Sequence, residues 1–195
     1  MKFFETIRIQ DGKVYHIDYH NRRATKTRRE VFGIEKPFDL LPSITPPPKG
    51  LFRCKIVYDT EIRSVTYHPY TPKEVHSFKL LAADIDYRYK YLDRSAIDAL
   101  YAKRNGYDEI LIVTEGLVTD TSIHNVAFFY KGEWLTPAKP LLAGTTRARL
   151  LEAGKLREAD ITPKDLTKFA TMAIMNAMID FKILRSFTIK DAYAL

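Results

Sequence analysis

The N-terminal part of the chain alternates hydrophobic and polar positions, as a half-buried strand does. The segment FFETIRIQDGKVYHI alternates on both sides of Asp11 and Gly12, a pair typical of a tight β-hairpin turn. A helix is expected over the basic residues 20–30 and should end near Gly33, whereas the proline-rich residues 42–50 favour no regular structure. Strands are expected in LFRCKIVYD, IRSVTYHPY and HSFKLLAADI. These patterns predict a small sheet with one helix.

From about residue 85 the pattern changes to helices between strands. Hydrophobic positions at spacings of three and four predict a helix over 93–105, with Asp93 as its N-cap and Gly106 as its stop. A second helix is expected in AGTTRARLLEAGKL and a short third in TPKDL. The expected strands are EILIVT, LVTD, VAFFY, EWLTP, TMAIMNAM and FKILRSFTI.

Length and composition fit two small lobes. The 195 residues, 46% of them hydrophobic, suffice for one sizeable core or two smaller ones. We therefore expect an α/β (α+β) fold, with a small N-terminal lobe at 1–85 and a larger C-terminal lobe at 86–195. The single Cys54 excludes an internal disulfide and supports no zinc or redox motif, as in a reducing compartment. Because no segment has the apolar run of a signal or a membrane span, a cytoplasmic protein is expected.

The balance of 31 basic and 24 acidic residues gives a net charge of +7. Such a charge fits nucleic acid, anionic small molecules or a solvated surface, and does not choose among them. The densest basic run is HNRRATKTRRE, and no zinc-finger spacing, aromatic RNA-binding signature or long basic tail accompanies it. We therefore expect no nucleic-acid partner and no metal site.

One lysine has an unusual place. Lys90 lies among tyrosines in YRYKYLDR, directly before the predicted helix 93–105. A helix N-terminus carries about half a positive elementary charge, so a neutral amine is favoured there over an ammonium. A neutral lysine amine attacks aldehydes, as in enzymes that form Schiff bases. The alternative is a lysine whose stem packs on the tyrosines and whose head lies in water.

The aldehyde cofactor pyridoxal phosphate would make two further demands. Its phosphate needs N–H groups and hydroxyls at a helix N-terminus, and its pyridine nitrogen needs a carboxylate. Gly144, Thr145 and Thr146 begin the second expected helix, and Asp120 ends a strand in LVTDTSIHN. Each also has an ordinary explanation, because threonines are common helix caps and aspartates are common in turns.

The order of these segments resembles the fold-type IV pyridoxal-phosphate enzymes, also called class IV aminotransferases. That family includes branched-chain and D-amino-acid aminotransferases and aminodeoxychorismate lyase. The resemblance is carried by Lys90, then NGYDEILIV, then GLVTDTSIHNVAFF, then WLTPAKPLLAGTTRARLLE, and extends from FFETIR at residue 3 to NAM at 176–178. It implies a homodimer and a two-lobed fold with the cofactor in the cleft.

The resemblance also implies the role of each site residue. Lys90 would be the catalytic residue, which forms a Schiff base with pyridoxal 5'-phosphate and moves a proton. Arg23, in the motif YHNRRA with His20, would bind the phosphate. Asp120 lies where the family has the longer glutamate at the pyridine nitrogen. The remaining phosphate-binding residues would be Thr145, Thr146 and Asn176.

The motifs KYLDR and NAM, and the basic charge, are closest to the lyase members. They imply an amino substrate, aminodeoxychorismate, from which 4-aminobenzoate and pyruvate form for folate synthesis. A branched-chain or D-amino-acid transaminase is the alternative. A non-enzymatic basic binding module is a third, disfavoured because an intact lysine and phosphate site would then have no use. The residues that could bind substrate carboxylates, or could instead form surface salt bridges, are Arg88, Arg94 and Arg149.

Overall fold

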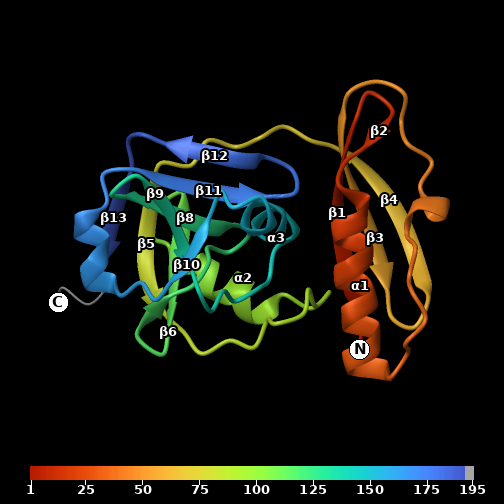
Figure 1. Cartoon of the computed structure of the whole chain (residues 1–195), viewed down its shortest axis with the longest axis horizontal. Helices are drawn as coiled ribbons and strands as arrows, with labels where there is room; N and C mark the ends of the chain where they lie inside the picture. The colour runs from red at the N-terminus through yellow and green to blue at the C-terminus, as the bar shows by residue number, and fades with distance from the viewer. Residues whose placement is uncertain (192–195) are drawn as a thin grey trace. The chain divides into compact units, whose positions relative to one another are not determined.

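The computed structural model describes residues 1–191 and contains two compact units, each of which can be followed in Figure 1. The N-terminal unit consists of residues 1–72 and 89–93, and the C-terminal unit consists of residues 73–88 and the chain from residue 94 onward. Both units have more strands than helices, which confirms the expected α+β class. The division differs from one boundary near residue 85, because the chain returns briefly to the N-terminal unit.

The N-terminal unit is an antiparallel sheet packed against one helix. Its strands are β1 (Phe3–Gln10), β2 (Lys13–Val14), β3 (Leu51–Tyr58) and β4 (Ile62–Pro69). Their order in the sheet is β2-β1-β3-β4, and the helix is α1 (Ile17–Phe32). Phe3, Ile7 and Ile9 of β1 form the core with Ala24 of α1 and with Ile56 of β3. The alternation of β1 thus places its odd-numbered side chains inside.

Two chain reversals in this unit follow the expected signals. Asp11 and Gly12 have φ of 50° and 78°, the left-handed values that a two-residue hairpin turn needs. Gly33 ends α1 with φ of 69°, and its N–H donates to the carbonyl of Arg29 at 3.0 Å. The hairpin and the helix end are therefore confirmed. A short 3₁₀ turn, η1 (Leu41–Ser43), follows α1.

Residues 90–92 extend the sheet along the outer edge of β1. The N–H of Phe4 donates to the carbonyl of Lys90 at 3.0 Å, and the N–H of Leu92 donates to the carbonyl of Lys2 at 2.9 Å. β2 pairs with the other end of the same strand. Lys90, expected in the larger lobe, therefore belongs to the same unit as α1.

The C-terminal unit contains two sheets. Its strands are β5 (Ser77–Ala82), β6 (Glu109–Thr114), β7 (Leu117–Val118), β8 (Asn125–Tyr130), β9 (Glu133–Pro137), β10 (Arg157–Ala159), β11 (Met172–Asn176), β12 (Asp180–Leu184) and β13 (Thr188–Asp191). One sheet has the order β10-β9-β8-β11-β12 and the other has the order β13-β5-β6-β7. Phe78, Leu111 and Val126 contribute to the core of this unit.

Two expectations about these strands are wrong. β5, expected in the N-terminal sheet, pairs in parallel with β6 and β13 of the C-terminal unit. Its alternating pattern reveals a strand but carries no information about a distant parallel partner. The segment FKILRSFTI, expected as one strand, forms both β12 and β13.

The helices of the C-terminal unit lie near their expected places. α3 (Thr145–Glu152) and the 3₁₀ helix η2 (Pro163–Lys168) follow their predicted caps. α2 (Ser95–Ala102) is shorter than the expected helix 93–105 at both ends, because Arg94 rather than Asp93 is its N-cap and Lys103 is its C-cap, ahead of the expected stop at Gly106. Since the charge of a helix end acts within its first turn, this later start weakens the argument for a neutral Lys90. Within residues 1–191, no helix is both long and apolar enough to cross a membrane.

Candidate functional site

A buried carboxylate, that of Glu5, organises the first group of site residues. Glu5 lies on β1 between the buried side chains of Phe3 and Ile7, and is itself 0% exposed. His20 and Arg23 lie one turn apart on α1, and both reach it. His20 Nδ1 is 2.6 Å from Glu5 Oε2, while Arg23 Nε and Nη2 donate to Oε1 and Oε2 at 2.8 and 2.5 Å. These bonds join the YHNRRA motif to the FFETIR motif.

The ionisation of this group follows from its contacts. Burial alone would raise the pKa of Glu5, but the charge of Arg23 and the hydrogen bonds of His20 and Arg23 outweigh it. The pKa of Glu5 therefore falls from 4.5 to about 2. Burial is the largest effect on His20 and lowers its pKa below 6.5, as do the charges of Arg23 and Lys90. Near pH 7 a neutral His20 thus donates its Nδ1–H to an ionised Glu5.

Lys90 lies in the same electrostatic environment. Its Nζ is 4.8 Å from the centre of the Phe4 ring, within the range of a cation–π contact. Its charge also contributes to the lowered pKa of His20. The N-terminal unit thus combines a lysine amine with the guanidinium of Arg23, whose planar fork suits carboxylate or phosphate.

Arg23→Ala should weaken the binding of pyridoxal phosphate. A charge-assisted contact to phosphate contributes about 1.5 to 3 kcal/mol, or roughly a tenfold to more than a hundredfold change in Kd. Arg22→Ala is the matched control, because the Arg22 guanidinium stacks on Tyr19 at 4.1 Å. Titration of both variants with pyridoxal phosphate measures the difference. An equal loss in the two would mean that overall charge, and not the position of Arg23, determines affinity.

The second group of site residues lies in the C-terminal unit, at the start of α3. Gly144 is the N-cap, and Thr145 and Thr146 are the first two helical residues, 7% and 5% exposed. The first N–H groups of a helix have no partner within the helix, and Gly144 supplies no side-chain cap to α3. Donors that converge on the positive end of a helix suit a phosphate. The residues present therefore fit the phosphate of the cofactor.

Asp120 is buried in the same unit, and both of its carboxylate oxygens accept a hydrogen bond. Its Oδ1 accepts a hydrogen bond from Asn125 Nδ2 and its Oδ2 accepts one from the N–H of Leu142, both at 2.8 Å. Burial raises its pKa to about 7, although these hydrogen bonds and the charge of Arg147 act in the opposite direction. Each oxygen keeps a second lone pair, so a further donor such as a pyridinium nitrogen can still be accepted.

Asp120→Asn should lower both the affinity for pyridoxal phosphate and the turnover of the loaded protein. An amide offers one acceptor where the carboxylate offers two, so either Asn125 or Leu142 faces an NH₂ group. Leaving such a donor unpaired costs about 1 to 3 kcal/mol. Affinity and turnover should be measured on one sample. If both stayed near wild type, Asp120 would serve only as a turn former, a role that asparagine fills equally well.

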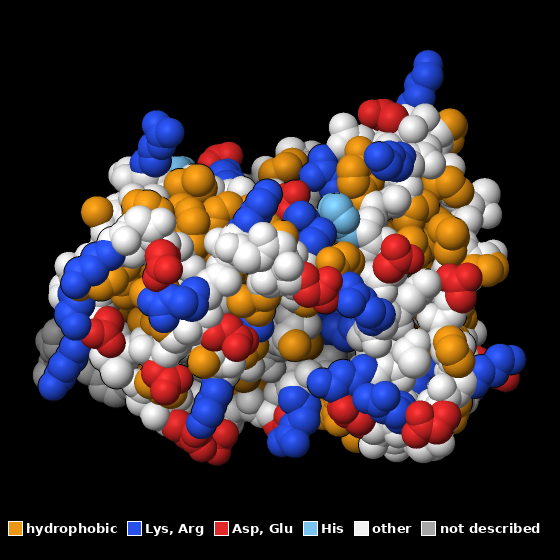
Figure 2. Space-filling view, viewed as in Figure 1, with side chains coloured by type: hydrophobic (Ala, Val, Ile, Leu, Met, Phe, Trp, Pro, Cys, Tyr) orange, Lys and Arg blue, Asp and Glu red, His pale blue; other side chains and the backbone are white. Residues whose placement is uncertain are grey.

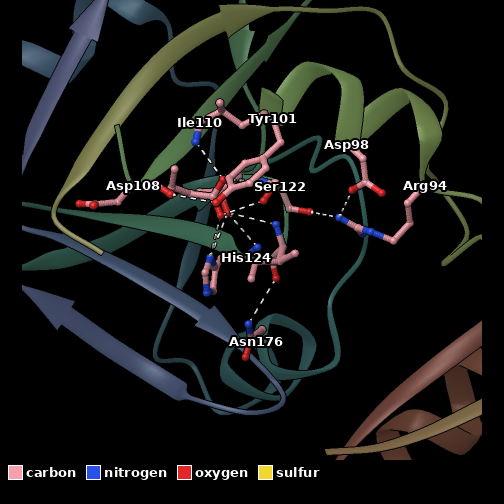
Figure 3. A network of polar contacts seen from close by, with 11 residues as sticks. Arg94, Asp98, Tyr101, Asp108, Ile110, Ser122, His124 and Asn176 are labelled. Carbon is pink, nitrogen blue, oxygen red and sulfur yellow. Dashed lines mark hydrogen bonds and ion pairs between the residues drawn. The ribbon is translucent and has the colours of Figure 1, made fainter. Parts of the chain in front are cut away.

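Asn176, which was predicted to bind phosphate, ends β11, and its side chain forms hydrogen bonds with backbone groups of the same unit. Its Oδ1 accepts from the N–H groups of Met178 and Ile179 at 2.9 and 3.1 Å. Its Nδ2 donates to the carbonyl of Ile123 at 3.4 Å (Figure 3). These bonds place Asn176 against the turn formed by residues 121–124.

A buried polar network holds that turn (Figure 3). Glu109 Oε2 accepts from Ser122 Oγ at 2.8 Å, and Arg94 Nη2 donates to the carbonyl of Ser122 at 3.0 Å. Burial raises the pKa of Glu109 and lowers that of His124 to about 4, so His124 is neutral near pH 7. This network was not predicted, although a glutamate directly before the hydrophobic run ILIV indicates a buried carboxylate.

The three arginines considered for substrate carboxylates form ion pairs with nearby aspartates. The pairs are Arg88–Asp86, Arg94–Asp98 and Arg149–Asp180. On the face shown in Figure 2, Lys and Arg side chains are interspersed with Asp and Glu side chains. This mixture favours the explanation of the net charge as a solvated surface.

Comparisons with known proteins agree with these motifs. The model of the family described as amino-transferase class IV matches residues 55–186. An uncharacterized protein of Haemophilus influenzae is 40% identical over 181 residues, which cover 90% of this chain and 96% of that protein. A crystal structure from Haemophilus somnus 129PT, provisionally named 4-amino-4-deoxychorismate lyase, is 37% identical with a TM-score of 0.84. The match covers 91% of this chain and 96% of that one.

A more distant structure has the same fold. A hypothetical aminotransferase from Mycobacterium tuberculosis, in its PLP-bound form, matches with a TM-score of 0.75 and 17% identity. The match covers 95% of this chain and 81% of that chain. At this identity the likeness concerns the fold alone.

Proposed function

The chain belongs to the class IV aminotransferase family, and from this premise we propose that it is a pyridoxal-phosphate enzyme with aminodeoxychorismate lyase activity. The observation that supports the proposal is the start of α3, which has a glycine N-cap without a side-chain cap, followed by buried Thr145 and Thr146. The motif KYLDR and the similarity to the Haemophilus somnus protein favour the lyase reaction over transamination.

Each residue has a proposed part. Thr145 and Thr146 would bind the phosphate through N–H and hydroxyl groups, and Arg23 would add a charge-assisted bond. Lys90 would hold the cofactor aldehyde through Nζ and then move the substrate proton. Asp120 would face the pyridine nitrogen, and Asn176 would complete the phosphate contacts. When bound, the cofactor supplies an electron sink that stabilises the carbanion needed for either reaction.

The cellular setting is also a proposal. Cys54 is buried, and burial raises the pKa of its thiol to about 11, so it is a poor candidate for redox chemistry. We place the protein in the cytoplasm, acting on a small amino substrate. The family resemblance implies a homodimer, and sedimentation of the purified protein should give twice the mass of one chain.

Product analysis tests the reaction. Purified protein with pyridoxal phosphate and aminodeoxychorismate should release 4-aminobenzoate and pyruvate in equal amounts. Parallel reactions should offer branched-chain amino acids or D-amino acids together with an α-keto acid. If amino groups were transferred in these reactions and no 4-aminobenzoate formed, the protein would be a transaminase. If neither reaction occurred, the lyase proposal would fail together with its alternative.

A further inference from the structure

The loop before α3 is held by two side chains from a single turn of the C-terminal unit. Asn125 Nδ2 donates to the carbonyl of Leu142 at 2.8 Å and to Asp120 Oδ1 at 2.8 Å. Asp120 Oδ2 accepts from the N–H of Leu142, also at 2.8 Å. Both polar backbone groups of Leu142 are therefore fixed by this pair. Leu142 precedes the helix N-cap, Gly144, by two residues.

Gly144 brings the backbone against Asn125. Its φ of −68° and ψ of 147° are open to any residue, so the backbone conformation does not require a glycine. A Cβ at this position would lie 1.9 Å from Asn125 Oδ1, far inside van der Waals contact. Glycine is therefore required at position 144 because the Asn125 amide occupies the volume that a side chain would need.

The turn that carries the two side chains is itself anchored. Asp120 and Asn125 form a β-bridge, and the N–H of Thr121 donates to the carbonyl of His124 at 2.9 Å. Between them, Ser122 is bonded to the buried Glu109. Because the turn is fixed in this way, the loop that is hydrogen-bonded to it is fixed as well.

We propose that Asn125 is a positioning residue, which sets the phosphate donors of Thr145 and Thr146 by fixing Leu142 and Gly144. This inference rests on the proposed cofactor. Asn125 suits the task because one amide nitrogen supplies two donors, for a carboxylate and for a carbonyl. Without Asn125, Asp120 and Leu142 each lose a hydrogen-bond partner. Part of the free energy of cofactor binding is then used to order the loop, so the affinity for the cofactor falls.

The phosphate preference tests this inference without measuring activity. Kd is measured by equilibrium dialysis for pyridoxal phosphate and for pyridoxal, which lacks the phosphate. Asn125→Ala should raise Kd for pyridoxal phosphate by roughly tenfold to a hundredfold, and should raise Kd for pyridoxal clearly less, because the two ligands share only the proposed contact of Asp120 with the pyridine nitrogen. An equal loss for both ligands, or an unchanged preference, would overturn the positioning role. A wild-type protein without any phosphate preference would instead overturn the proposed function.

Asn21→Ala is the matched control. Asn21 also joins a carboxylate to a backbone group, because it donates to Asp39 at 2.8 Å and accepts from the N–H of Leu40 at 3.0 Å. These bonds are made to Asp39 and Leu40 and not to the loop before α3, so the loss of Asn21 should leave the phosphate preference unchanged. A similar loss of preference in this variant would mean that any broken loop contact suffices, and would contradict a specific role for Asn125.

Gly144→Ala provides a second test if Asn125→Ala folds poorly, as thermal unfolding would reveal. The added methyl group must displace the Asn125 amide, so this variant should lose phosphate preference as well. The double variant Asn125→Ala/Gly144→Ala should be no worse than Asn125→Ala, because the colliding atom is gone. Fully additive losses would mean that the two residues act separately, and would overturn the inference.

Discussion

Lys90→Ala should abolish turnover and the visible absorbance of the protein-bound cofactor, while the fold is kept. A positioned acid–base residue contributes up to about 10⁴-fold to a rate, and the proposed covalent link to the cofactor is lost as well. The fold should survive because the hydrogen bond from the N–H of Phe4 to the carbonyl of residue 90 is retained in alanine, while the cation–π contact of Lys90 with Phe4 contributes only about 0.5 to 1 kcal/mol. Steady-state kinetics, an absorbance spectrum and a circular dichroism spectrum measure the three quantities.

Lys55→Ala is the matched control for this experiment. Lys55 Nζ lies 5.1 Å from the centre of the same Phe4 ring, from the neighbouring strand β3. Its removal takes away a lysine and a cation–π contact of the same kind, and should leave turnover near wild type. Comparable losses in the two variants would assign the effect to the charge around Phe4 and would contradict a covalent role for Lys90.

Glu5→Gln should destabilise the N-terminal unit by about 3 to 5 kcal/mol, the usual effect of removing one partner of a buried ion pair. The amide places an NH₂ group where a carboxylate oxygen accepts hydrogen bonds, and leaves Arg23 without its anion. Urea unfolding measures the free energy, and hydrogen exchange of β1 and α1 peptides locates the change. Glu133→Gln is the control, since Glu133 is 57% exposed and its pair with Arg157 contributes little.

The difference between wild type and Glu5→Gln should depend on pH. The folded pKa of Glu5, about 2, lies below its ordinary value of 4.5, so folding favours the ionised form. Its contribution is therefore complete above pH 4.5 and is lost as the pH falls toward 2. The lowered pKa of His20 acts in the same direction below pH 6.5 in the wild-type protein. A difference that stayed constant down to pH 2 would contradict an ionised Glu5.

Local signals in the sequence predicted most of the elements. The Asp11–Gly12 turn, the end of α1 at Gly33 and the cap of η2 depend on a few neighbouring residues, and the structure has them where the pattern indicates. The sheet to which β5 belongs depends on pairing with the distant strand β6. Sequence periodicity does not contain that information.

The site was predicted only in part, because sequence patterns again contain no information about contacts between distant residues. The family resemblance selected Lys90, Arg23 and the threonines of α3, and the family assignment is confirmed. The roles of these residues stay predictions. Glu5 was missed, although a charged residue in phase with Phe3 and Ile7 indicates a buried carboxylate that needs partners. The hydrogen bond from Asn125 to Leu142 had no comparable signal, because it joins the start of β8 to a loop 17 residues further along the chain.

Borohydride reduction of the wild-type protein loaded with pyridoxal phosphate tests the central claim most directly. Reduction makes a lysine–cofactor link permanent, and peptide mass spectrometry then identifies the modified residue. We expect one cofactor per chain, attached to the peptide that contains Lys90. A label on another lysine, such as Lys55 or Lys103, or no label on a protein that binds the cofactor, would contradict the account.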